Sequence, residues 1–457
     1  MRLRTTASTL VLLSILHAVR LGAQVPQNLT LDEAIGIALE QNREIQAARL
    51  ELGKADAQVD EAFGNALPTV DLNSRYTWNI RRPVFFFPGE DDVVRPISIG
   101  SKNALTADLS VQQILFNSAV LTGVGASRIY AQISRQALRS EASDVILRIK
   151  KAWYGVLLSR EVLAVNEALM TNAEANYANV KVLYDAGLRA EFDALRAEVT
   201  VANLKPQIIQ GRDVYRNAVD GFLVALGYDN LVEQQVEISG EFALPATGTP
   251  ITESFAELEG EMLENNPQLV QLRRLTDVNR ELIELDRSEY LPTVALFGTW
   301  KFEGQADNIG DLDFQPSAFA GLNLSLNLYN GGRTSAKVEQ SEIEWQQSRF
   351  EVAELEAILR LQLRSTLRRI DAAVEQISAS ERTISQAERA YTIATASYRA
   401  GTGTQLQIND ADLALAQARL NRLSALHEFN VALAELEHLV GRHVILSGDE
   451  IEYVAAR

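Results

Sequence analysis

Hydrophobic and polar residues follow two different periods along the chain, and together they predict helices separated by pairs of strands. Apolar residues recur at helical spacing over 31–67 and 254–291. Each of these stretches begins at Thr, Asp or Ser cap candidates and ends at a Leu-Pro pair, which disfavours further helix. Alternating polar and apolar positions then predict four strands, at 70–80, 105–111, 294–302 and 322–328. We expect each strand pair to have one apolar and one polar face.

Much longer helices are predicted after each strand pair, over about 117–185 and 330–399. A helix of this length is on the order of 100 Å long. In the second one, apolar residues recur at coiled-coil spacing, at Val352, Leu355, Leu359, Leu363, Leu367, Ile370, Val374 and Ile377. Each long helix stops at a glycine turn, 186–188 or 400–402, and a return helix is expected to run to Gly227 or Gly441.

The two halves of the chain are versions of one unit. An offset of 224 residues aligns 38–42 with 262–266 and Pro68 with Pro292, and an offset of 214 aligns Gly187 with Gly401. A period this long indicates duplication of one large unit and not a solenoid. The predicted divisions are a first repeat over 24–230, a linker over 231–250, a second repeat over 251–445 and a tail over 446–457.

The N-terminus has the layout of a secretory signal peptide, which we assign to residues 1–23. Arg2 and Arg4 precede the apolar run 10–16, and a small residue precedes Gln24. A buried N-terminal helix is the alternative. Beyond this segment no window of about 18 apolar residues occurs, so any membrane crossing falls to the strands.

Composition excludes several classes of function. The chain of 457 residues carries a formal net charge of −17, which repels nucleic acid, and it has no cysteine for disulfides, thiolate metal sites or thiol catalysis. No nucleophile and base recur in a catalytic arrangement, so the sequence indicates no enzyme and no cofactor. The spacing of His427, His438 and His443 is poor for a metal site, and we expect packing or surface roles.

Four strands per chain leave two open edges, which hydrocarbon does not tolerate. Closed membrane barrels begin at eight strands. Two chains would supply eight strands and three would supply twelve, and only the larger barrel leaves a wide aqueous lumen. A soluble sheet edge is the alternative.

The paired motifs resemble those of the TolC-like outer membrane efflux proteins across essentially all of the mature chain. They are Ala66-Leu67-Pro68-Thr69 with Tyr290-Leu291-Pro292-Thr293, and Tyr184-Asp185-Ala186-Gly187-Leu188 with Tyr398-Arg399-Ala400-Gly401-Thr402. The resemblance implies a mainly α fold with a membrane β-barrel portion. In the homotrimer that it implies, four strands per protomer contribute to a 12-stranded outer-membrane barrel, and long antiparallel coiled-coil helices form a trimeric α-barrel in the periplasm.

The resemblance also implies partners and site residues. The partners are a periplasmic adaptor, an inner-membrane pump and outer membrane lipid. Asp410 falls where the family has a gate aspartate, Gln407 replaces another, and Asp412 is a nearby acid. Gly403 stands where many members carry an arginine that ties the gate shut. The adaptor-contacting turns are Gly187, Leu188, Gly401 and Thr402, and Pro68 and Pro292 mark strand entry.

Several of these residues also have a simpler structural interpretation. Asp410 also fits a solvated acid in the first turns of a helix. Tyr76, Trp78 and Trp300 fit either an interfacial aromatic girdle or packing between protomers. For the whole chain, the predicted function is a passive exit duct of a tripartite efflux or type I secretion system, and the alternative is a soluble periplasmic coiled-coil scaffold.

Overall fold

The computed structural model describes residues 28–88, 94–228, 237–245, 251, 253–442, 444–447 and 450–453. The predicted signal peptide, most of the predicted linker and His443 lie outside the described residues. The chain divides into two compact units. The first contains the described residues within Met1–Gln46, Glu141–Met262 and Leu361–Arg457, and the second comprises those within Ala47–Ser140 and Leu263–Arg360.

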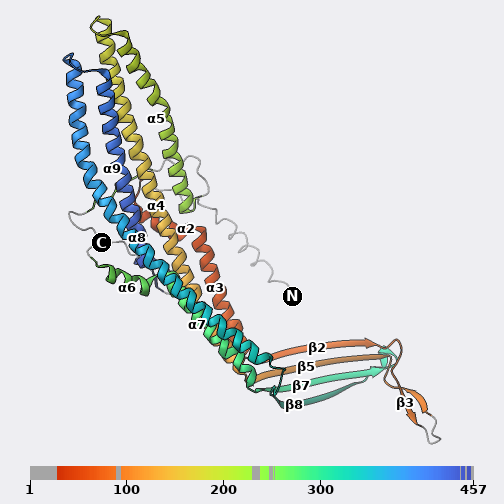
Figure 1. Ribbon diagram of the computed structural model, residues 1–457. Coiled ribbons are helices and arrows are strands. Elements are labelled where there is room, and N and C mark those ends of the chain that lie inside the picture. Colours follow the sequence, from red (N-terminus) through yellow and green to blue (C-terminus); the bar gives the residue numbers. More distant parts are fainter. Residues whose placement is uncertain are drawn as a thin grey trace, which may run out of the picture. The chain divides into compact units, whose positions relative to one another are not determined.

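Helices dominate the chain, and the mainly helical prediction is confirmed (Figure 1). They are α2 (Leu31–Gln41), α3 (Arg43–Gly64), α4 (Ser118–Asp185), α5 (Glu191–Leu226), α6 (Phe255–Asn265), α7 (Pro267–Arg287), α8 (Arg333–Arg399) and α9 (Gln405–Val440), with 3₁₀ turns η2 (Ser288–Tyr290) and η3 (Ile309–Asp311). Long helices were expected at α4 and α8, and the return helices α5 and α9 end at Gly227 and Gly441 as predicted. Within the described residues, no helix has the length and apolar character needed to cross a bilayer.

The prediction of one continuous helix before each strand pair is wrong, because an asparagine interrupts both. Asn42 follows α2 with extended backbone, and its side-chain oxygen accepts the Glu44 N–H at 2.9 Å, so it starts α3. Asn266 does the same for α7, where it accepts the Leu269 N–H at 3.1 Å and Pro267 takes the first helical position. An Asn side chain at an N-cap satisfies a backbone donor that a continuous helix would not expose. These two residues are equivalent in the duplication.

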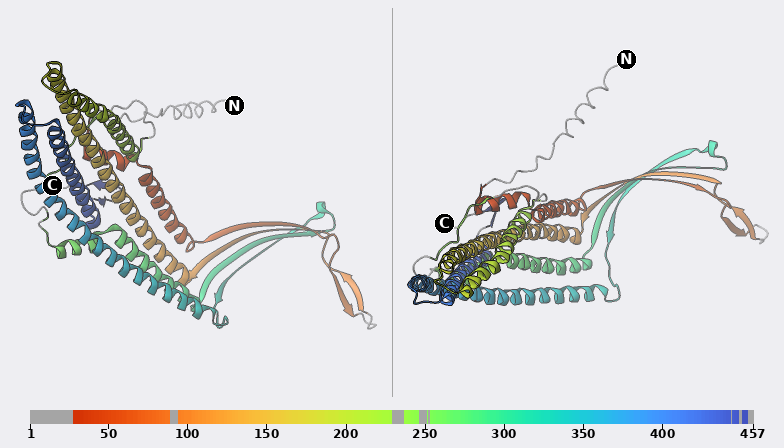
Figure 2. Two further views of the ribbon diagram at one scale, coloured as in Figure 1. Left: turned by 45° about the horizontal axis from the view of Figure 1, so that its top comes forward. Right: turned by 90° about the horizontal axis from the view of Figure 1, so that it is seen from above.

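Four long strands form one antiparallel sheet in the order β2-β5-β7-β8 (Figure 2). Their bounds are β2 (Thr69–Trp78), β5 (Asn103–Phe116), β7 (Thr293–Ala306) and β8 (Phe314–Ser325). The last strand was expected at 322–328 and instead spans earlier residues. Its final pair is Ser325 with Thr293, because β7 begins directly after Pro292 and later residues have no partner strand. Small residues at Ala318 and Ala320 weakened the alternation over its true first half.

Several short strands have no counterpart in the predictions. β1 (Asn28–Leu29) pairs in parallel with β6 (Glu237–Ile238), and hairpins form from β3 (Val84–Pro88) with β4 (Val94–Ser98) and from β9 (Val444–Ser447) with β10 (Glu450–Tyr453). The described part of the predicted linker, 237–245, lies against α4 and α9. Arg160 donates to the carbonyls of Ile238 and Gly240 at 3.0 and 2.8 Å, and Asn430 bonds both backbone groups of Ala243 at 3.1 Å.

In the first unit, apolar side chains pack around one buried tryptophan. Trp153 on α4 is 3 % exposed and meets Phe222 on α5 edge-on at 5.7 Å between ring centroids. A Cβ at Gly240 would lie 2.6 Å from the Trp153 ring, so only glycine lets this segment pass. Phe242, two residues on, stacks on Tyr154 and meets His427 edge-on. Burial raises the pKa of Tyr154 to about 12.

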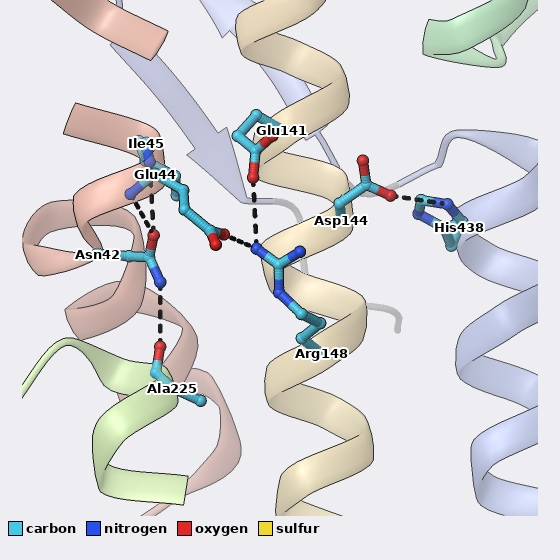
Figure 3. Close-up of polar contacts among 8 residues, drawn as sticks. All are labelled: Asn42, Glu44, Ile45, Glu141, Asp144, Arg148, Ala225 and His438. Carbon is cyan, nitrogen blue, oxygen red and sulfur yellow. Dashed lines mark hydrogen bonds and ion pairs between the residues drawn. The ribbon is translucent and has the colours of Figure 1, made fainter. Parts of the chain in front are cut away.

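Polar contacts tie α4 to its neighbours in the same unit (Figure 3). The guanidinium of Arg148 pairs with Glu44 of α3 and with Glu141 of its own helix. His438 on α9 bonds Ser143 Oγ through Nδ1 at 2.9 Å, and its Nε2 lies 3.4 Å from Asp144. Burial lowers the pKa of His438, and the carboxylate of Asp144 opposes this only in part.

Ion pairs and hydrogen bonds join the helices of the second unit. Arg273 on α7 pairs with Glu356 on α8 at 2.8 Å, and Arg287 pairs with Glu342 at 2.7 Å. Glu289 accepts a hydrogen bond from Thr334 at 2.7 Å and pairs with Lys337. The predicted coiled-coil positions of α8, of which Leu363 to Ile377 belong to the first unit, are buried or half-buried, which confirms that spacing.

Replacing Gly227 by alanine is expected to destabilise the protein by about 2 kcal/mol or more. Gly227 has φ of 101°, where a side chain is strained, and its Cβ would lie 2.9 Å from the Gln41 carbonyl oxygen. Thermal unfolding of the detergent-solubilised protein measures the change. Gly36→Ala is the matched control: Gly36 lies inside α2 with open space around it, so alanine should stabilise by up to about 1 kcal/mol. Equal stability of Gly227→Ala and wild type would contradict the argument.

Acidification is expected to destabilise the first unit through His438. The pKa of His438 is lowered in the folded state. Once the pH falls through the ordinary histidine pKa of about 6.5, the unfolded chain therefore binds more protons than the folded chain does. The thermal midpoint should therefore drop between pH 7.5 and 5.5, and His438→Gln should reduce that drop. His427, whose pKa burial also lowers, contributes in the same direction, so the double variant should flatten the profile further. An unchanged profile in the double variant would refute this origin.

Candidate functional site

One face of the four-stranded sheet is apolar and the other is polar. The register places Leu72, Leu109 and Trp300 in one row of the apolar face, where Leu72 and Trp300 are 75 % and 55 % exposed. The next row on the opposite face holds Asn73, Asp108 and Lys301. This sheet exposes a large apolar surface on one face and polar residues on the other. Such a sheet is suited to contact lipid on its apolar side and water on its polar side.

Large aromatic residues occupy the part of the apolar face that lies farthest from the helix-to-strand junctions. Tyr76 and Trp78 end β2, and Phe302 stacks on Trp300 at 5.8 Å between centroids. The register puts Phe314 opposite Gly304, in the row of Tyr76. Aromatic rings of this kind concentrate at membrane interfaces. Toward the helices the same face carries aliphatic residues, such as Val70, Leu322 and Leu324.

Two of the four long strands begin directly after the predicted prolines. Pro68 stands immediately before β2, and Pro292 immediately before β7. Both lack a backbone N–H, and both separate a preceding helix or 3₁₀ turn from extended backbone.

The two turns between the long and return helices have similar local geometry. Gly187 and Gly401 have φ of 71° and 81°, the left-handed conformation that glycine was predicted to supply. Backbone N–H groups of the following residues cap the helix ends, with Leu188 to Leu183 at 2.9 Å and Thr402 to Ser397 at 3.0 Å. Leu188 is 70 % exposed, so this apolar side chain has little to pack against within the chain.

Gly403, which stands where the resemblance places an arginine in many members of the family, has no room for a side chain. A Cβ at Gly403 would lie 2.9 Å from the backbone nitrogen of Tyr398 and 3.0 Å from the carbonyl carbon of Ser397. A cation reaches Tyr398 from the other turn instead. Arg189 donates to the Tyr398 carbonyl at 2.8 Å, and its guanidinium lies 4.4 Å from the centre of that ring. Arg189 thus joins the first turn to the end of α8, a contact that sequence reasoning missed.

The three predicted gate residues have different surroundings at the start of α9. Gln407 accepts the Thr404 N–H at 2.9 Å and forms a capping box with it. Asp410 is exposed. Asp412 is 8 % exposed and accepts a hydrogen bond from Asn172 on α4 at 2.9 Å. Burial raises the pKa of Asp412, and the Asn172 hydrogen bond opposes that shift.

Beneath the turns, a small apolar cluster holds the four helices together. Its buried members are Val180, Ala197, Tyr398 and Ile408, one from each of α4, α5, α8 and α9. The hydroxyl of Tyr398 is buried and has no hydrogen-bond partner in the described part of the chain. Burial and the nearby Asp193 raise the pKa of this phenol. No group of three or more side chains suited to holding a metal ion occurs among the described residues.

Comparisons with known proteins agree with these features. The profile of the family described as "Outer membrane efflux protein" matches residues 34–227 and 258–442. The alkaline protease secretion protein AprF of Pseudomonas aeruginosa is 23 % identical over 78 % of this chain and 72 % of its own length. The outer membrane protein TolC of Escherichia coli is 21 % identical over 88 % of this chain and 80 % of its own length.

Solved structures show the same fold. The outer membrane channel CmeC of Campylobacter jejuni superposes with a TM-score of 0.75 at 15 % identity, covering 90 % of this chain and 85 % of CmeC. The duplicated profile match covers most of the described chain, and the sheet has the two-faced character of a membrane strand set. The chain therefore belongs to the outer membrane efflux protein family, and it is an outer membrane efflux channel and not an enzyme.

Proposed function

We propose that three copies of this chain form a passive exit duct, with a twelve-stranded barrel in the outer membrane and a helical tunnel in the periplasm. The observation that carries the proposal is the four-stranded sheet with one apolar face. Its outer strands β2 and β8 each leave a row of backbone groups without a partner strand in the described chain. In lipid such edges need partners, and copies of the same chain supply them.

Polar residues of the sheet would then line the lumen. Asp71, Asn73 and Arg75 lie on one side of β2, and Lys301 and Glu303 continue that face on β7. Mixed charge of this kind keeps a pore wet and gives it no tight binding site. The net charge of the chain, −17, favours cationic over anionic cargo.

The energy for transport would come from partners. A periplasmic adaptor docking at the turns 187–188 and 401–402 would connect the duct to an inner-membrane pump. One relative is named for alkaline protease secretion and another is named an outer membrane efflux protein, so both polypeptide secretion and efflux fit a duct of this kind. The exposed Leu188 is the side chain best placed for an apolar contact with such an adaptor.

The alternative of a soluble periplasmic scaffold has little support. A scaffold does not require an apolar sheet face, and the family to which the chain belongs is one of outer membrane channels. A coiled-coil scaffold would also leave Leu72, Trp78 and Leu322 in water, each more than 60 % exposed.

Asp410 is proposed as the cation-binding residue of the periplasmic gate. Three exposed carboxylates around one axis repel one another and attract multivalent cations. In planar bilayers, Asp410→Asn should raise the cation concentration for half-block of current by about tenfold. Asp412→Asn is the matched control and should leave the block unchanged, because that carboxylate is buried against Asn172. Absence of any conductance from the purified trimer would reject the duct itself, whereas wild-type block in Asp410→Asn would reject only this gate.

Leu188 is proposed as an adaptor contact. Leu188→Asp places a charge on an exposed apolar position, and it should lower co-purification of a co-expressed periplasmic adaptor by about tenfold. Ile209→Asp makes the same change at a 69 % exposed position of α5, roughly 27 Å along the helix from its start. It should retain the adaptor if the turn is the contact. Both variants are first checked for trimers, and equal loss in both would argue against a contact confined to the turn.

A further inference from the structure

The connection between β2 and β5 carries an apolar hairpin that the duct itself does not require. β3 and β4 pair Phe85 with Ile97 and Phe86 with Pro96. These side chains are exposed: Phe86 is 69 % accessible, Phe85 is 53 % and Ile97 is 51 %. The hairpin forms a separate two-stranded sheet, and an isolated ribbon of that size is marginally stable in water.

Backbone hydrogen bonds make this hairpin a continuation of the β2–β5 ribbon. The Asn79 N–H donates to Lys102 at 2.7 Å, and the Ile99 N–H donates to Pro83 at 2.9 Å. The last pair between β5 and β7 is Asn103 with Ala306, so the ribbon extends beyond the other two strands. Figures 1 and 2 show β3 past the end of the sheet, away from α3 and α7.

The alternation of polar and apolar residues that gives the sheet one water-facing side ends where the β2–β5 ribbon extends beyond the other two strands. Along β2, Asp71, Asn73 and Arg75 face one side, as a water-filled lumen requires. In β3, Phe85 and Phe87 lie on one face while Val84 and Phe86 lie on the other. Apart from Arg95, which stands opposite Phe87 in the register, the ribbon carries large apolar residues on both faces and is suited to surroundings that exclude water on both sides.

Lipid meets that requirement better than other copies of the chain. Contacts around a three-fold axis would cover one face of each hairpin and leave the other in water. The apolar face of the sheet is already the lipid-facing surface, and the hairpin continues from its aromatic end, next to Trp78. At its base the exposed cations Arg81 and Lys102 suit the anionic phosphates of lipid headgroups.

We propose that the β3–β4 hairpin inserts into the outer leaflet beside the barrel and serves as a membrane anchor. The inference rests on the proposed barrel, because it takes the apolar sheet face as the lipid-facing one. Exposed apolar side chains such as Phe86 would add to the hold of the barrel on the membrane. In this arrangement the Phe residues of the hairpin contact acyl chains, and Arg81 and Lys102 contact headgroup phosphates.

Spin labels on single cysteines test the proposal directly, since the natural chain offers no competing thiol. The full-length trimer is reconstituted into vesicles of phosphatidylethanolamine and phosphatidylglycerol with lipopolysaccharide. Labels are placed at Phe85→Cys and Phe86→Cys, one on each face of the hairpin. Leu72→Cys on the apolar sheet face and Asp311→Cys in the β7–β8 connection are the references. Collision rates with oxygen, which concentrates in lipid, are compared with those of a water-soluble nickel complex.

The proposal predicts that both hairpin labels and the Leu72 label collide several-fold more with oxygen, while the Asp311 label favours nickel. Hairpin labels that favour nickel while Leu72 favours oxygen would overturn the anchor and leave the barrel standing. Nickel preference at Leu72 as well would reject the barrel. Strong dipolar coupling between Phe86 labels of different protomers would also overturn the proposal, because it would place the hairpins against one another and not in lipid.

Discussion

Unpaired backbone groups at the edges of the sheet are the constraint on which the rest of this structure depends. The four strands of the described chain do not close on themselves, and in the proposed barrel the outer edges of β2 and β8 need partners because lipid does not solvate backbone groups. The duplicated sequence provides two strand pairs per chain, so fewer copies are needed for a wide barrel than with one pair.

The long helices are stabilised without one large apolar core. Their apolar positions form a narrow stripe, and α8 buries Leu363 and Ile370 while most of its surface stays polar. Much of the specificity then comes from single polar contacts. Examples are Asn42, which bonds the Ala225 carbonyl at 3.1 Å, and Arg160, which holds two carbonyls of the 237–245 segment.

The sequence was informative where one period persisted over many residues and uninformative where a single contact decided the outcome. The long helices, their glycine ends and the two-faced strands were predictable because many side chains repeat the same signal. The breaks at Asn42 and Asn266 had a signal, since the same residue recurs at the same place in both repeats. The helical pattern on either side of each asparagine is the stronger signal, and it predicts a continuous helix. The contact of Arg189 with Tyr398 joins residues 209 positions apart, and no local pattern reveals it. Burial of Asp412 likewise depends on Asn172 of another helix.

The crowding at Gly403 also limits how this turn can change through evolution. The nearest atoms to a new Cβ belong to the backbone of Ser397 and Tyr398, and backbone cannot swing aside as a side chain tip can. An arginine introduced at this position of the present chain would distort the last turn of α8. The contact made by Arg189 has no such barrier, because it approaches Tyr398 from the other turn. This backbone therefore tolerates other side chains at position 189, whereas any side chain at position 403 would strain it.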